Sequence, residues 1–188
     1  LTPNSSVTIL REQKGLDGAE LGRGNPKAIN QLLAHHAVVF QPEKRLMWLS
    51  TNPFQLGEFL CYDLNEVFSV SYDAPKPEGV YIDSLSIPAD PFLKSDEYEK
   101  FLRYKELKNR LFDYIIMSKD IEWNAELEKD FIQSNPESYI TYLMLGDYHL
   151  ESGNTTKAEE YYTVSLSKEV ASKQEREHIQ NNLESCKK

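Results

Sequence analysis

Cysteine, long apolar runs and basic clusters are all scarce in this chain. The two cysteines, Cys61 and Cys186, lie far apart in the sequence, which excludes a disulfide framework and a paired-thiolate zinc pattern. We expect each thiol to act as a small apolar filler. No apolar stretch approaches the roughly 20 residues that a membrane-spanning helix requires, so no membrane span is predicted.

Positive charge is also under-represented. The 188 residues include 21 Lys and Arg against 30 Asp and Glu, a formal net charge of -9. A net acidic chain without a basic cluster argues against binding to nucleic acid or to anionic membrane surfaces. Hydrophobic residues make up 40% and charged residues 27%, a balance typical of a globular protein with one medium domain or two small ones.

The most apolar part of the first half predicts two paired strands, residues 37–40 and 46–49, joined by a turn at Pro42. Neither strand alternates cleanly between apolar and polar residues, so the pair should be covered on both faces. We therefore expect four of its side chains to be largely buried: Val38, Phe40, Trp48 and Leu49.

Weaker signals of β-structure continue as far as Pro88 and Pro91. Phe68, Val70 and Tyr72 alternate with polar residues and indicate a weak strand, residues 74–79 read as a loop, and a further extended piece is expected between Val80 and Leu85. Pro88 and Pro91 do not suit a strand interior and should end the β-containing part. Before the strands, short helices are expected within residues 5–13, capped by Ser5 or Ser6, and within residues 26–33.

From Ser95 onward the apolar residues recur at helical spacing. They predict five helices, with faces marked by Phe101, Tyr104, Leu107, Leu111 and Ile115, then Trp123, Leu127 and Phe131, then Tyr139, Tyr142 and Leu145, then Ala158, Tyr162 and Leu166, and finally Ile179 and Leu183. We place the start of the third helix at Asn135 and Pro136 and its end at Gly153. The spacing from Ser172 to Glu175 is that of a capping box.

The third and fourth of these helices resemble a tetratricopeptide repeat. The resemblance is carried by Tyr142, Leu145, Gly146, Gly153, Ala158 and Tyr162, with His149 and Val170 as departures from the usual pattern. It implies a helical hairpin whose surface takes a peptide or protein partner. Tyr139, Tyr142, Tyr148 and Tyr161 are the candidates to line that surface; the alternative is that these rings pack the helices together.

The first third of the chain carries a second resemblance. Residues 8–11, 24–30, 34–40 and 48–57, in this order, resemble the end of the catalytic domain in the acyl-coenzyme A:6-aminopenicillanic acid acyltransferase family of linear-amide hydrolases and acyltransferases. The resemblance implies an N-terminal-nucleophile fold, in which self-cleavage exposes a nucleophile, usually cysteine, and an asparagine helps to hold the oxyanion. Both groups would precede Leu1, whose own side chain cannot act as a nucleophile.

Two local features invite a chemical interpretation. His35 and His36 are adjacent, so in an extended strand they point to opposite faces and do not form a metal pair. They are candidates for a substrate pocket shared with an upstream catalytic part, or for hydrogen-bonded histidines at a strand entrance. Gly18, Gly22 and Gly24 punctuate a loop around Leu21 and Arg23, but their spacing fits neither the Walker pattern nor the dinucleotide-binding fingerprint, which favours a plain turn.

The sequence thus predicts an α+β protein: a part with a short β-hairpin, residues 1–91, followed by an all-α, tetratricopeptide-like array of helical hairpins, residues 95–188. The expected function is that of the non-catalytic C-terminal portion of an amide-bond hydrolase or acyltransferase, and the alternative is a protein-interaction module. No cofactor or metal is expected. The expected partners are the upstream catalytic part and a peptide or protein on the helices. The compartment is not set by the sequence, although a signal peptide on the parent protein would place it in the periplasm or outside the cell.

Overall fold

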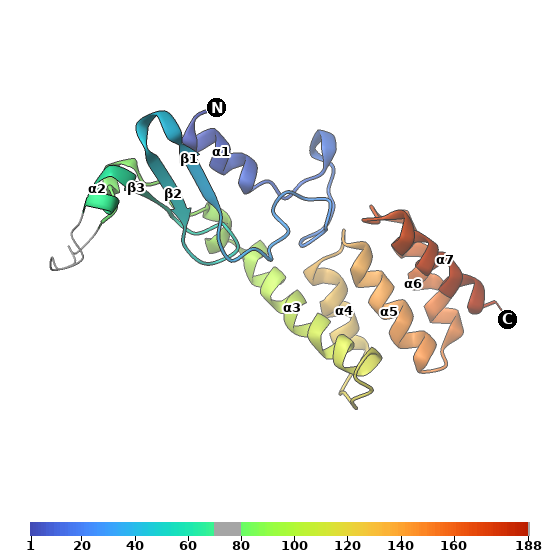
Figure 1. The fold of residues 1–188 in the computed structure, drawn as a ribbon. Helices are drawn as coiled ribbons and strands as arrows, with labels where there is room; N and C mark the ends of the chain where they lie inside the picture. The colour runs from blue at the N-terminus through green and yellow to red at the C-terminus, as the bar shows by residue number, and fades with distance from the viewer. Residues whose placement is uncertain (70–79, 188) are drawn as a thin grey trace. The chain divides into compact units, whose positions relative to one another are not determined.

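The computed structural model describes residues 1–69 and 80–187, and its contacts group into two compact units. The sheet unit contains Leu1–Gln13 and Ile29–Ser95, and the helical unit contains Lys14–Ala28 and Asp96–Lys188. A small antiparallel sheet is followed by helices, as Figure 1 shows, so the predicted α+β class is confirmed. The domain division at residues 91 and 95 stays a prediction, but residues 14–28 join the helical unit rather than the part that surrounds them in sequence.

The sheet unit begins with α1 (Pro3–Leu10), which the side chain of Thr2 caps by accepting a hydrogen bond from the Ser5 amide. The helix therefore starts earlier than predicted, because Thr2 provides the cap and Pro3 suits the first turn. The strands β1 (Val38–Gln41), β2 (Leu46–Ser50) and β3 (Phe59–Asp63) form a three-stranded antiparallel sheet in the order β1-β2-β3. The tight connection between β1 and β2 is the 3₁₀ turn η2 (Pro42–Lys44).

The third strand is a finding that the sequence did not predict. β3 pairs with β2 along its whole length, with Trp48 opposite Cys61, whereas only the strands of residues 37–40 and 46–49 were predicted to pair. Tyr81 and Ile87 add isolated bridges to β3, with the 3₁₀ turn η3 (Asp83–Leu85) between them. A second short turn, η4 (Pro91–Lys94), follows.

The predicted weak strand is wrong at its start, because Phe68 lies in α2 (Leu64–Ser69). Its other two apolar residues, Val70 and Tyr72, and the predicted loop of residues 74–79 lie outside the described residues.

The two faces of the sheet differ strongly in burial. One face packs Trp48 and Cys61 against Val7 of α1, in a core that also holds Ala37 and Phe59. The other face carries two apolar rows that cross all three strands, namely Val38, Leu49 and Leu60, and Phe40, Met47 and Tyr62. The predicted burial is correct for Trp48 but wrong for Val38 and Phe40, which are 41% and 59% exposed; Leu49 is half-buried. Val38 and Phe40 lie on β1, an edge strand, and face away from α1.

The helical unit contains α3 (Asp96–Ile115), α4 (Ala125–Ser134), α5 (Tyr139–Glu151), α6 (Thr155–Ser167) and α7 (Lys173–Ser185), drawn from green-yellow to red in Figure 1. Asn124, Asn154 and Ser172 cap α4, α6 and α7 with their side chains. The predicted start of α5 at Asn135 and Pro136 is wrong. The helix begins after Ser138, since the Asn135 side chain is engaged elsewhere.

The helices α5 and α6 form a hairpin and approach each other closely at Gly146. A Cβ added to Gly146 would lie 2.5 Å from the Tyr162 ring, and Ala158 is fully buried beside it. Tyr139, Val170 and Ile179 complete this core and bring α7 against the hairpin. Glycine is needed at position 146 because no side chain fits between the two helices.

The glycine-rich loop packs on the helices instead of forming a separate binding loop. Gly22 has a φ of +75°, and a Cβ there would lie 2.3 Å from the Ser138 nitrogen. Asn135 holds both backbone groups of Arg23, accepting from its N–H and donating to its C=O at 2.9 Å each. Buried Asn25 donates to the backbone oxygens of Leu21 and Glu169. The helix expected within residues 26–33 is absent, because turns occupy this stretch.

Candidate functional site

The two adjacent histidines lie in an exposed segment just before β1. His36 Nδ1 is 3.4 Å from the Ser50 backbone oxygen, and the neighbouring Ala37 amide donates to the Ser50 hydroxyl at 2.7 Å. This arrangement agrees with hydrogen bonding at a strand entrance, and a role of His35 or His36 in a substrate pocket stays a prediction. Among residues 1–69 and 80–187, no group of three or more His, Cys, Asp and Glu side chains could hold a metal ion.

The tyrosines proposed as a partner surface are either buried or half-buried. Tyr139 is fully buried and donates its hydroxyl to Glu175 Oε1 at 2.5 Å; burial first, and then this carboxylate, raise the pKa of Tyr139. Tyr142 is 9% exposed and donates to the Pro136 oxygen. Both rings therefore pack the helices, which was the alternative interpretation. Tyr148 is half-buried, with its ring centroid 5.0 Å from that of Tyr114.

A buried polar cluster joins α4, α5 and α6. Glu128 Oε2 lies 2.7 Å from His149 Nε2, while Oε1 accepts from the Tyr161 hydroxyl at 2.6 Å and from Lys157 Nζ at 3.2 Å. The His149 and Tyr161 rings stack with centroids 5.5 Å apart. Glu128 and His149 are only 8% and 6% exposed, so polar side chains occupy a buried position between these helices, where apolar side chains are usual.

The charge of Glu128 is stabilised by its partners. Burial by itself would raise the pKa of this carboxyl group, but the hydrogen bonds from Tyr161, His149 and Lys157 outweigh it and leave the pKa lowered. Each oxygen of the carboxylate already has a partner, which leaves it poorly suited to act on a substrate. We interpret the cluster as a structural link between three helices. The sequence analysis missed Glu128, because a glutamate near the start of a helix usually faces water.

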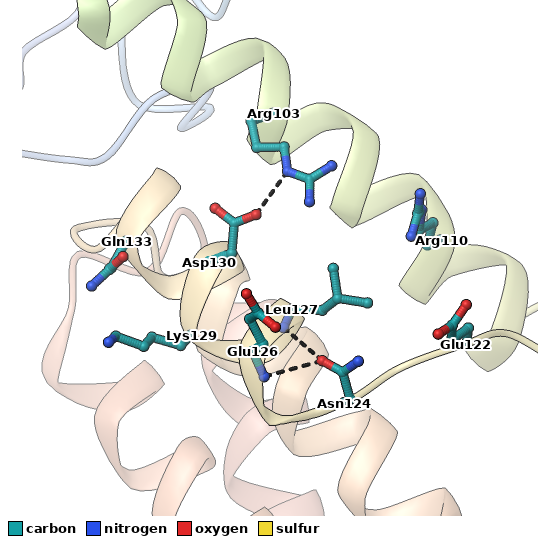
Figure 2. A pocket seen from close by; sticks show the side chains of 9 residues that line it. All are labelled: Arg103, Arg110, Glu122, Asn124, Glu126, Leu127, Lys129, Asp130 and Gln133. Carbon is teal, nitrogen blue, oxygen red and sulfur yellow. Dashed lines mark hydrogen bonds and ion pairs between the residues drawn. The ribbon is translucent and has the colours of Figure 1, made fainter.

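A larger cavity, of about 580 Å³, lies between α3 and α4. Figure 2 shows that its lining is polar apart from Leu127 and that Arg103 on α3 pairs with Asp130 on α4, at 2.8 Å. Arg103 and Arg110 also both bind Glu106. The lining carries Arg103, Arg110 and Lys129 against Glu122, Glu126 and Asp130, so its positive and negative side chains are equal in number, and Arg103 and Asp130 neutralise each other.

A smaller cavity, of about 260 Å³, lies where α3, α5 and α7 meet. Ile115, Ile116 and Leu150 form its apolar lining, and Asp147, Glu151, His178 and Asn182 form its polar lining. Asp147 accepts hydrogen bonds from the Tyr162 hydroxyl at 2.7 Å and from Asn182 Nδ2 at 3.2 Å. Burial raises the pKa of Asp147, although these two bonds and nearby His178 oppose the rise.

Comparison with known proteins identifies no relative of this chain. No protein-family model, no curated protein and no solved structure matches this chain. The two resemblances therefore depend only on the residues quoted for them and stay predictions. In the part of the chain that the structure describes, no helix is both long and apolar enough to cross a bilayer.

Proposed function

We propose that this chain is a non-catalytic protein and that its helical unit is a tetratricopeptide-like module that binds a peptide segment of a partner. The observation that carries the proposal is the contact between Gly146 and Tyr162, because it joins α5 and α6 as closely as a repeat hairpin requires. The hairpin is flanked by α3 and α4 on one side and by α7 on the other. Stacked helical hairpins leave extended surfaces that suit peptide segments.

The binding face is the one formed by α3, α5 and α7. The smaller cavity opens on it, and Phe112, Ile116 and Met117, which are 48%, 61% and 56% exposed, lie at the adjoining end of α3. Clusters of exposed large apolar side chains next to polar groups are typical of interaction sites. The cavity between α3 and α4 is a poorer candidate, because two of its charged groups, Arg103 and Arg110, already form ion pairs with Asp130 and Glu106.

The test is selection of displayed random peptides by the purified chain, followed by titration of a synthetic peptide from the enriched group. Ile116→Glu should weaken this peptide by about tenfold or more, since it places a charge in an apolar contact. Val164→Glu is the matched control, because Val164 is an exposed apolar residue of α6 and its replacement should leave binding unchanged. No enriched peptide, or binding that Ile116→Glu does not affect, would contradict the proposal.

The outer face of the sheet favours a second candidate function. Two apolar rows cross β1, β2 and β3 there, and the described residues leave Val38 and Phe40 exposed. A sheet that is apolar on both faces is normally covered on both. This supports the resemblance to N-terminal-nucleophile amide hydrolases, in which the upstream catalytic part of the same protein would cover this face.

Separate expression of the upstream polypeptide and of this chain tests the second candidate. The two should co-purify, and Phe40→Lys should abolish the association by placing a charge on the contact face. Leu33→Lys is the control, since Leu33 is 68% exposed and lies outside the sheet. Association that survives Phe40→Lys, or an upstream polypeptide that does not bind, would rule this candidate out.

A further inference from the structure

We infer that the cavity between α3, α5 and α7 binds the cationic side chain of an arginine or lysine in the partner peptide. The inference rests on the proposed function and adds the chemistry that this face recognises. Its volume of about 260 Å³ is below the roughly 300–1,000 Å³ of pockets for drug-sized ligands. A cavity of this size suits a single long side chain.

In the lining of this cavity, one basic side chain, His178, stands against two carboxylates, Asp147 and Glu151. No ion pair joins Asp147 or Glu151 to a lysine or arginine among the described residues, whereas the acids of the α3–α4 cavity include Asp130, which pairs with Arg103. Both hydrogen bonds that Asp147 accepts go to Oδ1. Oδ2 therefore remains for a donor that enters the cavity, and Glu151 supplies a second carboxylate at the exposed rim.

The apolar lining suits the rest of a long cationic side chain. Arg and Lys bury their methylene stems along apolar surface while the charged end remains at a polar group. Ile115 and Leu150 line the cavity and can contact such a stem. Phe112 and Met117 are exposed and lie within three residues of the lining residue Ile115 in sequence, so they can contact an apolar residue next to the cation.

The direct test compares three synthetic peptides that differ only in the central side chain: acetyl-Leu-Arg-Leu-amide, its citrulline analogue and its glutamate analogue. Citrulline has nearly the shape of arginine without the charge. We expect the arginine peptide to shift amide resonances of α5 and α7 in a titration of the labelled full chain. Its affinity should exceed that of the citrulline peptide by about tenfold, as for a charge-assisted pair that is partly desolvated. Equal affinities, or shifts confined to other helices, would overturn the inference.

Two variants locate the carboxylates that bind the cation. Asp147→Asn removes the charge and keeps an oxygen that accepts from the Tyr162 hydroxyl. Glu151→Gln removes the charge at the exposed rim. Each variant should lower the affinity for the arginine peptide and leave the affinity for the citrulline peptide unchanged. Glu160→Gln is the matched control, because Glu160 is exposed on α6 and does not line the cavity. If Asp147→Asn fails to fold, Glu151→Gln decides, and wild-type affinity in that variant would overturn the inference.

The failure of this inference is distinct from the failure of the proposed function. If the chain selects peptides whose binding depends on Ile116 but shows no preference for a cationic side chain, the proposed interaction role stands and the cation site is ruled out. A chain that enriches no peptide loses the interaction role itself.

Discussion

Gly146 illustrates how one residue sets the distance between two helices. Glycine within a helix is less favourable than alanine by roughly 1 kcal/mol, so its presence in α5 needs a compensating contact. The Tyr162 ring provides it, since that ring occupies the space where a Cβ would lie, and its hydroxyl is held by Asp147 at 2.7 Å. The fully buried ring has no room to move aside.

At position 146 we therefore expect even a methyl group to destabilise the helical unit. Gly146→Ala should lower the free energy of unfolding by about 1–2 kcal/mol despite its better helix propensity, and Gly146→Leu by about 3 kcal/mol or more. Denaturant unfolding of the full chain measures both. Gly146→Ala combined with Tyr162→Leu should be less destabilising than the sum of the two single changes, because the smaller side chain removes the clash. Strict additivity would show that the two residues do not interact.

Glu128 predicts a pH-dependent contribution to stability. Its pKa is lowered in the folded protein, so the folded state binds fewer protons at this site than the unfolded state. The stabilisation is therefore fully present above the ordinary glutamate pKa of 4.5 and is lost as the pH falls through the lower folded value.

Comparison of the parent with Glu128→Gln isolates this contribution from that of other carboxyl groups. At neutral pH the variant should be less stable by about 2–3 kcal/mol, because the charge-assisted bonds to Tyr161, His149 and Lys157 are weakened in a buried site. The difference should shrink below about pH 4.5, where the parent also becomes neutral. Denaturant midpoints measured at several pH values provide the readout, and a difference that is constant from acid to neutral pH would contradict the assignment.

Among the elements, the strands show why an apolar run does not by itself determine burial. In β1 and β2, successive side chains point to opposite faces, but only one face meets α1 and its Val7. Trp48 faces that core and donates its indole N–H to the Leu85 oxygen at 2.8 Å. Phe40, on the other face, stays exposed although its sequence context is just as apolar.

The two aromatic residues should therefore respond differently to the same type of change. Trp48→Ala should destabilise the sheet unit by about 3–5 kcal/mol, as for the removal of a packed aromatic residue, whereas Phe40→Ala should stay within about 0.5 kcal/mol of the parent. Thermal unfolding followed by circular dichroism measures both. A large loss on Phe40→Ala would indicate that the outer face is covered in solution.

For the whole molecule, the main result is that the units do not follow the order of the sequence. Residues 14–28 interrupt the sheet unit in sequence and yet belong to the helical unit, which they contact through Gly22, Arg23 and Asn25. Each unit contains one of the two tryptophans, Trp48 in the sheet unit and Trp123 in the helical unit. Fluorescence can thus follow the helical unit alone once Trp48 is replaced by phenylalanine.

In this Trp48→Phe background, Leu21→Ala should destabilise the helical unit even though position 21 lies far from the helices in sequence. Leu21 is 2% exposed, and removal of such a side chain is typically unfavourable by about 2–5 kcal/mol. Leu16→Ala is the matched control, since Leu16 lies in the same loop but is 88% exposed. If the two changes shift the Trp123 unfolding midpoint equally, the loop does not belong to the helical unit.

The sequence by itself determined the features that depend on local periodicity and local chemistry. Apolar residues at helical spacing, together with the capping side chain of Ser172, specified the helical half, and the small residues Gly146 and Ala158 specified the close hairpin. These features were predictable because helix contacts join residues three or four apart and a cap binds its own first turn.

Only the tertiary structure decided the features that depend on distant residues. It paired β3 with β2, exposed Val38 and Phe40, and placed the glycine-rich loop on the helices. It also buried Glu128 beside His149 and placed Asp147 in the lining of a cavity between three helices. None of these follows from spacing, because the partners come from different elements of the chain: Glu128 and His149 are 21 residues apart, and Arg23 and Asn135 are 112 apart.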